Sequence, residues 1–207
     1  KQIVDIICQG NPPQETMKFT IAEGMTVEAI GKRLVDLGVF DNSDRFLELC
    51  RDGSAFASNY QFVKTLAEES TGDRTYLLEG YLFPDTYEFY EFTNCDEVTR
   101  RFLDRTLEIY EDHLVEFNAS EFSIHEVFTL ASIVQGETGN SADAVLVAGV
   151  FVNRYNEPEI LASSVTSCYA FELTAEECYS FGESTAYTWK DHPYNTYTNQ
   201  GLPPGPV

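Results

Sequence analysis

Residues 17–38 read MKFTIAEGMTVEAIGKRLVDLG, and this short stretch joins a strand pattern to a helix pattern. Its first five residues alternate between apolar and polar side chains, which is typical of a half-buried strand. Val27, Ile30 and Leu34 then recur at helical spacing, with Thr26 as the predicted N-cap and Gly38 as the predicted stop. The stretch therefore predicts one strand followed by one amphipathic helix.

A second helix pattern follows, which Asn42 or Ser43 caps and which carries Phe46, Leu47 and Leu49. One strand and two short helices predict a small α+β module, to which we assign residues 1–59. The end of this module, residues 52–59, is rich in Gly, Ser and Asn and is predicted to be a connection. Residues 60–207 are then expected to form a second, mainly helical domain.

Two further segments of the second domain have clear patterns. Residues 79–89, EGYLFPDTYEF, are dense in aromatic side chains and are broken by Pro84. A helix interior does not tolerate this proline, so we expect two short extended pieces around a turn. A long helix is predicted over residues 96–117.

The charge balance excludes several classes of partner. The chain has 34 Asp and Glu residues against 13 Lys and Arg residues, for a formal net charge of -21. Such a surface repels the phosphates of nucleic acids and anionic membrane faces, whereas neutral sugars remain compatible with it. The sequence contains no apolar run of the roughly 20 residues that a membrane span needs, and no signal peptide. Residues 2–10 read as a helix without an initiator Met, so we expect an excised piece whose missing N-terminus could hold an anchor.

The cysteines do not form a metal-binding pattern. Cys8, Cys50, Cys95, Cys168 and Cys178 form no CxxC motif and no Cys/His cluster, so we expect no metal site. Their scattered positions favour mostly free, buried thiols over a disulfide framework. Cys168 and Cys178 are the one pair that we consider for a bridge.

The strongest candidate for a chemical group ends a helix. Residues 123–126, SIHE, form a capping-box pattern, and Leu130, Ile133 and Val134 share the face of Glu137 further along the same helix. Burial against apolar groups raises a carboxyl pKa, which suits a general acid near neutral pH. The competing interpretation is a solvated surface group, the usual role of a Glu in so acidic a chain. A second helix is expected from Ser141.

The C-terminal stretch 192–207, HPYNTYTNQGLPPGPV, is too poor in aliphatic side chains to build a core. Its aromatic, amide and hydroxyl groups suit sugar rings, which offer apolar C–H faces and hydroxyl edges. A structured surface loop held by its prolines is the alternative.

Four segments together resemble the YceG-like, or MltG-like, family of endolytic murein transglycosylases. They lie in the family's order and span most of the chain: FTIAEGMTVEAIGKRLVDLGVF (19–40), EGYLFPDTYEF (79–89), LASIVQGET with VAGVFVNR (130–138 and 147–154), and PYNTYTNQGLPPGP (193–206). Some family members carry an older label as aminodeoxychorismate lyases. That label implies pyridoxal phosphate, but the sequence has no motif for a Schiff-base lysine, and we expect no cofactor.

The resemblance implies a membrane-anchored protein that acts on the extracytoplasmic face of a bacterial cell membrane. Its expected parts are a LysM-like module and a lysozyme-like catalytic domain that is truncated at its C-terminus. The expected reaction is lytic cleavage of peptidoglycan between N-acetylmuramic acid and N-acetylglucosamine, with cell-wall synthases as further partners. Glu137 corresponds to the family's catalytic residue, and the substrate-binding residues are expected to be Gln135, Thr138, Asn153, Tyr194, Asn195 and Tyr197.

Two segments depart from the family pattern. The family motif Glu-Lys-Glu-Thr reads QGET here, at residues 135–138, so the catalytic Glu and the following Thr are retained but the two residues before them differ. The family segment Leu-Gln-Ser-Asp-Pro-Thr-Val reads LASSVTS at residues 161–167. These departures leave open an alternative function, a catalytically weak or inactive relative that binds glycan or acts as a scaffold in cell-wall synthesis.

Overall fold

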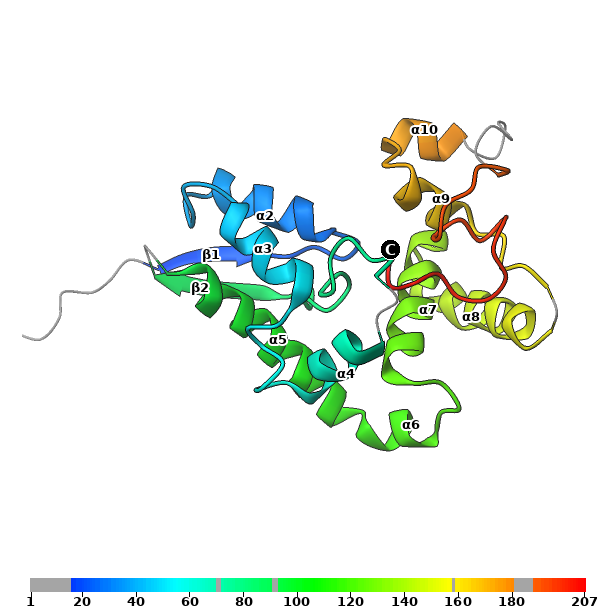
Figure 1. The fold of residues 1–207 in the computed structure, drawn as a ribbon, viewed down its shortest axis with the longest axis horizontal. Helices are drawn as coiled ribbons and strands as arrows, with labels where there is room; N and C mark the ends of the chain where they lie inside the picture. The colour runs from blue at the N-terminus through cyan, green and yellow to red at the C-terminus, as the bar shows by residue number, and fades with distance from the viewer. Residues whose placement is uncertain (1–15, 70–71, 91–92, 158, 181–187) are drawn as a thin grey trace, which may run out of the picture.

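The computed structural model describes residues 16–69, 72–90, 93–157, 159–180 and 188–207. The helix predicted over residues 2–10, with Cys8, lies outside these ranges. The described residues form a mixed structure of helices and one two-stranded sheet (Figure 1). The predicted α+β class is therefore confirmed at this level.

The sheet pairs two segments that lie far apart in the sequence. Strand β1 (Thr16–Thr20) runs antiparallel to β2 (Thr86–Tyr90), and Phe19 lies opposite Tyr87 in the register. Of the two extended pieces predicted around Pro84, only the second is a strand. The first is a turn in which Gly80 has a φ of 78°, a left-handed conformation that glycine adopts without a steric penalty.

The predicted helix starts are confirmed in the first part of the chain. Helix α2 (Val27–Asp36) begins at Thr26, whose side chain accepts a hydrogen bond from the Ala29 N–H at 3.2 Å. Gly38, with a φ of 73°, follows the end of the helix. Helix α3 (Asp44–Asp52) begins at Ser43, one of the two predicted caps, and α4 (Gln61–Glu69) comes next.

The single long helix predicted over residues 96–117 is interrupted near its end. The structure has α5 (Cys95–Asp112) and a separate α6 (Leu114–Ala119), divided at His113. This break brings the Phe117 ring within 4.9 Å of Tyr110 and within 6.3 Å of Phe128, measured between ring centroids. The chain thus turns between α5 and α6 where these aromatic rings pack, and the spacing of apolar residues in the sequence did not predict this turn.

The remaining helices form the second half of the molecule. Helix α7 (Ile124–Glu137) has the predicted capping box, in which Ser123 and Glu126 exchange side-chain and backbone hydrogen bonds. It is followed by α8 (Ser141–Asn156), α9 (Ser164–Ala170) and α10 (Ala175–Tyr179). Figure 1 shows this group of helices beside the sheet and its helices, with the C terminus between the two groups.

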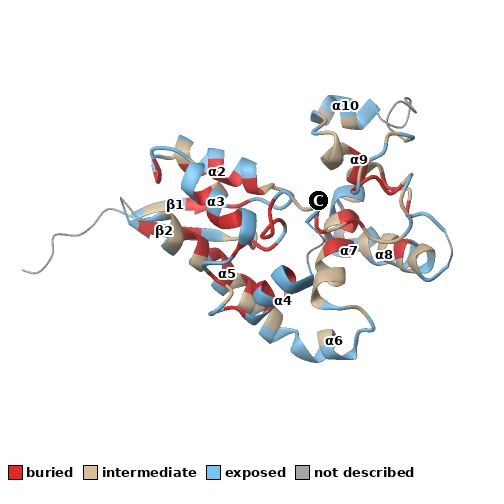
Figure 2. Ribbon diagram, in the orientation of Figure 1, coloured by how far each residue is buried: buried red, intermediate tan, exposed pale blue. Residues whose placement is uncertain are grey.

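Two hydrophobic clusters correspond to these two groups of elements (Figure 2). The larger core contains buried side chains from Phe19 to Leu103. The smaller core is formed by Leu130, Ile133, Val134, Phe151 and Leu161.

Packing crosses the position at which we predicted a domain boundary. Phe62, Leu66 and Phe102 lie after residue 59, yet they share the larger core with Phe19. The division into residues 1–59 and 60–207 stays a prediction. Among the described helices, none combines the length and the apolarity that a membrane crossing requires.

Candidate active site

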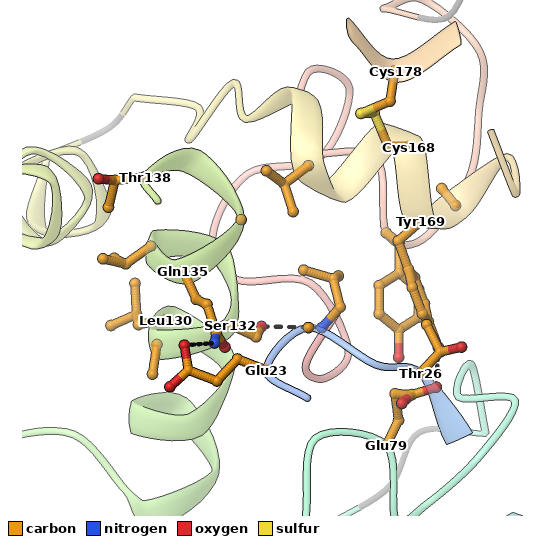
Figure 3. Close-up of a pocket in the computed structure, with 18 of the residues that line it drawn as sticks. Glu23, Thr26, Glu79, Leu130, Ser132, Gln135, Thr138, Cys168, Tyr169 and Cys178 are labelled. Carbon is orange, nitrogen blue, oxygen red and sulfur yellow. Dashed lines mark hydrogen bonds between the residues drawn. A yellow bond between two sulfur atoms is a disulfide. The ribbon is translucent and has the colours of Figure 1, made fainter. Parts of the chain in front are cut away.

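A cleft of about 1510 Å³ lies where the two groups of elements meet (Figure 3). The sheet-containing half contributes Glu23, Thr26 and Glu79 to its lining, and the helical half contributes residues of α7 and α9. A space of this size is larger than a typical small-molecule pocket, which measures about 300–1,000 Å³. The cleft can therefore accommodate an extended ligand.

Glu137 is the last residue of α7 and stands beside this cleft, between the lining residues Gly136 and Thr138. The apolar stripe before it is buried as predicted, since Ile133 is 0% and Val134 is 8% exposed. The predicted burial of Glu137 itself is wrong, because the residue is exposed. The buried stripe ends at Val134, one turn before the end of α7. The Glu137 carboxyl therefore lies outside the smaller core.

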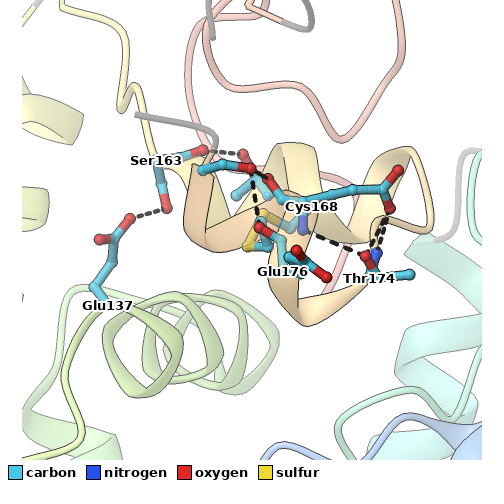
Figure 4. Close-up of a disulfide and its surroundings, with 9 residues drawn as sticks. Glu137, Ser163, Cys168, Thr174 and Glu176 are labelled. Atoms are coloured by element: carbon cyan, nitrogen blue, oxygen red, sulfur yellow. Dashed lines mark hydrogen bonds between the residues drawn. A yellow bond between two sulfur atoms is a disulfide. The ribbon is translucent and has the colours of Figure 1, made fainter. Parts of the chain in front are cut away.

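One buried hydroxyl holds the Glu137 carboxyl (Figure 4). Ser163 is only 1% exposed, and its Oγ donates a hydrogen bond to Glu137 Oε1 at 2.5 Å. The negative charge of Glu137 also helps burial to raise the pKa of Tyr197, so the tyrosine hydroxyl lies within electrostatic reach of the carboxylate. The structure thus brings Glu137 and the C-terminal stretch to the same place.

The two departures from the family pattern lie against each other. A Cβ atom at Gly136 would come within 2.5 Å of Val165 Cγ1, so these residues of α7 and α9 are in close contact. Gly136 stands where the family has Lys, and Val165 stands where it has Pro. The two altered positions therefore form one contact between α7 and α9, next to Glu137.

Two of the predicted substrate-binding residues flank Glu137 and line the cleft. Gln135 is exposed, and its Nε2 donates a hydrogen bond to Glu23 Oε2 at 3.2 Å across the cleft. Thr138 caps the end of α7, and its Oγ1 exchanges hydrogen bonds with the backbone of Asn140. Both residues are within the cleft wall, as expected for substrate contacts.

The four other predicted residues have different surroundings. Tyr194 lines the cleft, and burial raises its pKa to about 12. Tyr197 lies close enough to Glu137 for the two groups to interact electrostatically. Asn153 is exposed on α8, outside the cleft lining. Asn195 is fully buried, and its side chain bonds Ser167 Oγ, the Lys190 carbonyl and the Tyr197 N–H. Asn195 thus holds the loop together from inside.

Sequence reasoning missed a buried carboxyl in the cleft lining. Glu79 is 5% exposed, its Oε1 accepts the Val27 N–H at 2.9 Å, and its Oε2 accepts the Tyr169 hydroxyl at 3.3 Å. Burial raises the pKa of Glu79 to about 7, the environment that we had expected at Glu137. Figure 3 shows Tyr169 of α9 reaching toward Thr26 and Glu79. The aromatic-rich segment 79–89 was the available signal, but nothing local marks its first residue as buried.

The described cysteines comprise one bridged pair and two free thiols. Cys168 and Cys178 form a disulfide between α9 and α10, so the one pair considered is bridged (Figure 4). Cys50 and Cys95 are free, and only Cys50 is fully buried. In the described ranges, no group of three or more His, Cys, Asp or Glu side chains is placed to hold a metal ion.

Known proteins resemble this chain along almost its whole length. It is 35% identical to an endolytic murein transglycosylase of Streptococcus pneumoniae (strain ATCC BAA-255 / R6) over 94% of the chain, and 29% identical to one of Bacillus subtilis (strain 168) over 92%. The chain spans 37% and 52% of the length of these two relatives.

The fold has a solved counterpart as well. The crystal structure of a YceG-like protein from Listeria monocytogenes matches 99% of this chain and 66% of its own, with a TM-score of 0.77 and 28% identity. In the family comparison, residues 1–207 match the YceG-like family. The segments that suggested this resemblance thus lie in a chain that matches the family from end to end, and the protein belongs to the YceG-like family.

Proposed function

We propose that this protein cleaves the glycan strands of peptidoglycan between N-acetylmuramic acid and N-acetylglucosamine and leaves 1,6-anhydromuramyl ends. The observation that carries the proposal is the Glu137 carboxyl, which is exposed beside a large cleft and hydrogen-bonded to the buried Ser163. Two relatives named endolytic murein transglycosylase support the same reaction class.

In the proposed reaction, Glu137 first acts as a general acid. It gives its proton to the glycosidic oxygen while the bond from that oxygen to C1 of the muramyl sugar breaks. The resulting carboxylate then takes the proton of the muramyl 6-hydroxyl as the oxygen closes on C1. Because no water is consumed, the reaction does not require the second carboxylate that glycoside hydrolysis uses.

The cleft suits this substrate in size and in lining. Tyr169 of α9 offers an aromatic face for a sugar ring, and Gln135 and Thr138 offer amide and hydroxyl groups beside Glu137. Gln135 and Thr138 are the proposed direct substrate contacts. Tyr194, Tyr197 and Asn153 remain predicted substrate-binding residues, whereas the fully buried Asn195 supports the C-terminal loop from inside.

The same proposal covers the setting of the enzyme. It places the protein at the extracytoplasmic face of the bacterial membrane, with peptidoglycan as substrate and cell-wall synthases as partners. It assigns a LysM-like module to residues 1–59 and a lysozyme-like catalytic domain to residues 60–207. The family membership of the chain supports these assignments.

The test is digestion of purified peptidoglycan followed by mass analysis of the products. Anhydromuramyl ends are expected from the wild-type chain and are expected to vanish in Glu137→Gln. Reducing ends in their place would indicate hydrolysis. Intact glycan that still binds the protein would indicate the scaffold function.

A second variant separates the role of Glu137 from that of Glu79, the buried carboxyl of the cleft lining. Glu79→Gln removes the buried carboxyl and leaves Glu137 in place. If Glu79→Gln abolishes product formation and Glu137→Gln does not, the acid has been assigned to the wrong residue.

A further inference from the structure

Ser163 lies in the segment that leads from α8 to α9, far in sequence from the end of α7. Its Oγ reaches Glu137 Oε1 at 2.5 Å, which is short for a hydrogen bond between hydroxyl and carboxylate oxygens. The serine is 1% exposed, whereas Glu137 is exposed. One carboxyl oxygen of Glu137 is therefore hydrogen-bonded to a buried side chain, as Figure 4 shows.

The Ser163 backbone is itself fixed by two buried threonines. Its N–H donates to Thr196 Oγ1 at 3.1 Å, and its carbonyl accepts from Thr166 Oγ1 at 2.8 Å. The two threonine hydroxyls lie 2.8 Å apart, and both residues are at most 1% exposed. Satisfied polar groups inside a protein restrain geometry, because each lost bond would leave a buried group unpaired.

The preceding residue adds a further restraint. Ala162 has a φ of 54°, a conformation that costs energy for a residue other than glycine. Its N–H donates to the Thr196 carbonyl at 3.1 Å. The C-terminal stretch thus holds residues 162 and 163 through one residue, Thr196.

The direction of the Ser163 bond has a chemical consequence. An ionised carboxylate only accepts hydrogen bonds, so the single hydroxyl hydrogen of Ser163 points at Oε1. We propose that Ser163 is a positioning residue, which occupies Oε1 of Glu137 and leaves Oε2 as the oxygen that exchanges the proton with the substrate.

This inference rests on the proposed function and adds the roles of the two oxygens. The proton on Oε2 goes to the glycosidic oxygen as that oxygen separates from C1. Oε2 then accepts the proton of the 6-hydroxyl as the new bond from O6 to C1 forms. The Ser163 hydrogen stays on Oγ throughout, and the carboxyl cannot rotate freely while it is held there.

The test compares Ser163→Ala with Ser163→Thr, using uncrosslinked glycan strands and counting anhydromuramyl ends per folded molecule. Loss of the hydroxyl is expected to lower kcat roughly tenfold to a hundredfold and to change KM less than about twofold. Ser163→Thr retains a hydroxyl and is expected to recover most of the lost kcat. Thr99→Val is the matched control, because it removes a fully buried hydroxyl of α5 and should leave kcat unchanged.

Thr196→Val tests the support behind Ser163 and guards against a Ser163 variant that fails to fold. It is expected to lower kcat severalfold, and its effect should be less than additive with Ser163→Ala. Additive effects would contradict the proposed support.

The outcomes separate this inference from the proposed function. If Ser163→Ala keeps kcat within about twofold of wild type while Glu137→Gln is inactive, the positioning role is overturned and the function stands. Equal losses in Ser163→Ala and Ser163→Thr, with both variants folded, would also overturn it. If Glu137→Gln itself retains full activity, the proposed function fails.

Discussion

At the scale of single residues, Gly136 shows how closely α7 and α9 pack beside the proposed acid. Val165 occupies the space into which any side chain at position 136 would project, since its two methyl carbons lie 2.5 and 2.8 Å from the position that a Cβ atom would take there. The Val165 side chain is β-branched and stiff, so it cannot rotate away easily. The glycine is therefore required by a close approach of two helices.

We predict that Gly136→Ala destabilises the protein by about 1–2 kcal/mol, despite the better helix propensity of Ala, because the new methyl group overpacks the contact with Val165. Denaturant unfolding measures the change. Gly149→Ala is the matched control: it lies in α8 with nothing within 4 Å of the added carbon, and it should stabilise by about 0.5–1 kcal/mol. A neutral Gly136→Ala would mean that α9 is free to move.

Glu79 is the other residue whose surroundings have a measurable consequence. In the unfolded chain its carboxyl ionises near its ordinary pKa of 4.5, but in the folded protein it does so near 7. Between these values the folded protein binds more protons than the unfolded chain. The free energy of unfolding therefore falls as pH rises through this window.

We expect this contribution to reach about 3 kcal/mol, since each pH unit of displacement corresponds to about 1.4 kcal/mol. Glu79→Gln stays neutral at every pH and should lose this part of the pH dependence. Urea unfolding of both proteins from pH 4 to pH 8 measures it. A constant difference between the two curves would show that Glu79 does not titrate in this window.

At the scale of elements, α9 connects the important contacts of the cleft. Ser163 directly precedes this helix and bonds Glu137, Val165 packs on Gly136, and Tyr169 near its end bonds Glu79. Cys168 attaches the same helix to α10 through the disulfide. A helix of only seven residues needs such external restraints, because short helices are not stable alone.

We predict that the Cys168→Ala, Cys178→Ala double variant is less stable than wild type by about 2–3 kcal/mol, because a ten-residue loop is no longer closed in the unfolded chain. Denaturant unfolding with and without dithiothreitol measures the effect. The reductant should destabilise wild type and leave the double variant unchanged. A double variant as stable as wild type would mean that the bridge does not restrain α9.

At the scale of the whole molecule, α7 joins the two hydrophobic cores. Phe128 in its first half packs against the larger core, and Ile133 in its second half belongs to the smaller core. His125 on the same helix bonds the Tyr81 hydroxyl through Nδ1 and the Pro204 carbonyl through Nε2, both at 2.9 Å. The imidazole thus links the larger core, α7 and the C-terminal stretch.

The state of His125 follows from its partners. Burial and the positive charge of Arg74 lower its pKa, which favours the neutral ring. A carbonyl oxygen can only accept, so Nε2 carries the hydrogen and Nδ1 accepts from Tyr81. We predict that His125→Ala lowers the free energy of unfolding by about 2–4 kcal/mol. The substitution leaves a cavity where the ring was, and the Tyr81 hydroxyl and the Pro204 carbonyl lose their hydrogen-bond partner.

Thermal or denaturant unfolding tests this prediction, with His113→Ala as the control. His113 is an exposed histidine at the junction of α5 and α6, and its loss should change stability by no more than about 0.5 kcal/mol. Equal effects of the two variants would show that His125 does not hold the halves together.

Local interactions explain which features could be predicted from the sequence. Thr26 and Ser123 begin their helices because a side-chain oxygen accepts a backbone N–H three residues later. The buried stripe of α7 and the strand at residues 16–20 follow from apolar spacing along one segment. In each case the interacting groups lie within a few residues, so the pattern is visible in the sequence.

The burial and the hydrogen bonds of the site residues depend on contacts between residues that lie far apart in the sequence. Glu137 meets Ser163 across 26 positions, and Glu79 is buried beneath Tyr169 across 90 positions. The turn at His113 likewise accompanies the packing of Phe117 on Phe128, which belongs to another helix. Sequence periodicity identified α7 and its terminal acid, but burial and hydrogen bonding depend on which segments the folded chain brings together. The exposure of Glu137 and the raised pKa of Glu79 were therefore fixed only by the tertiary structure.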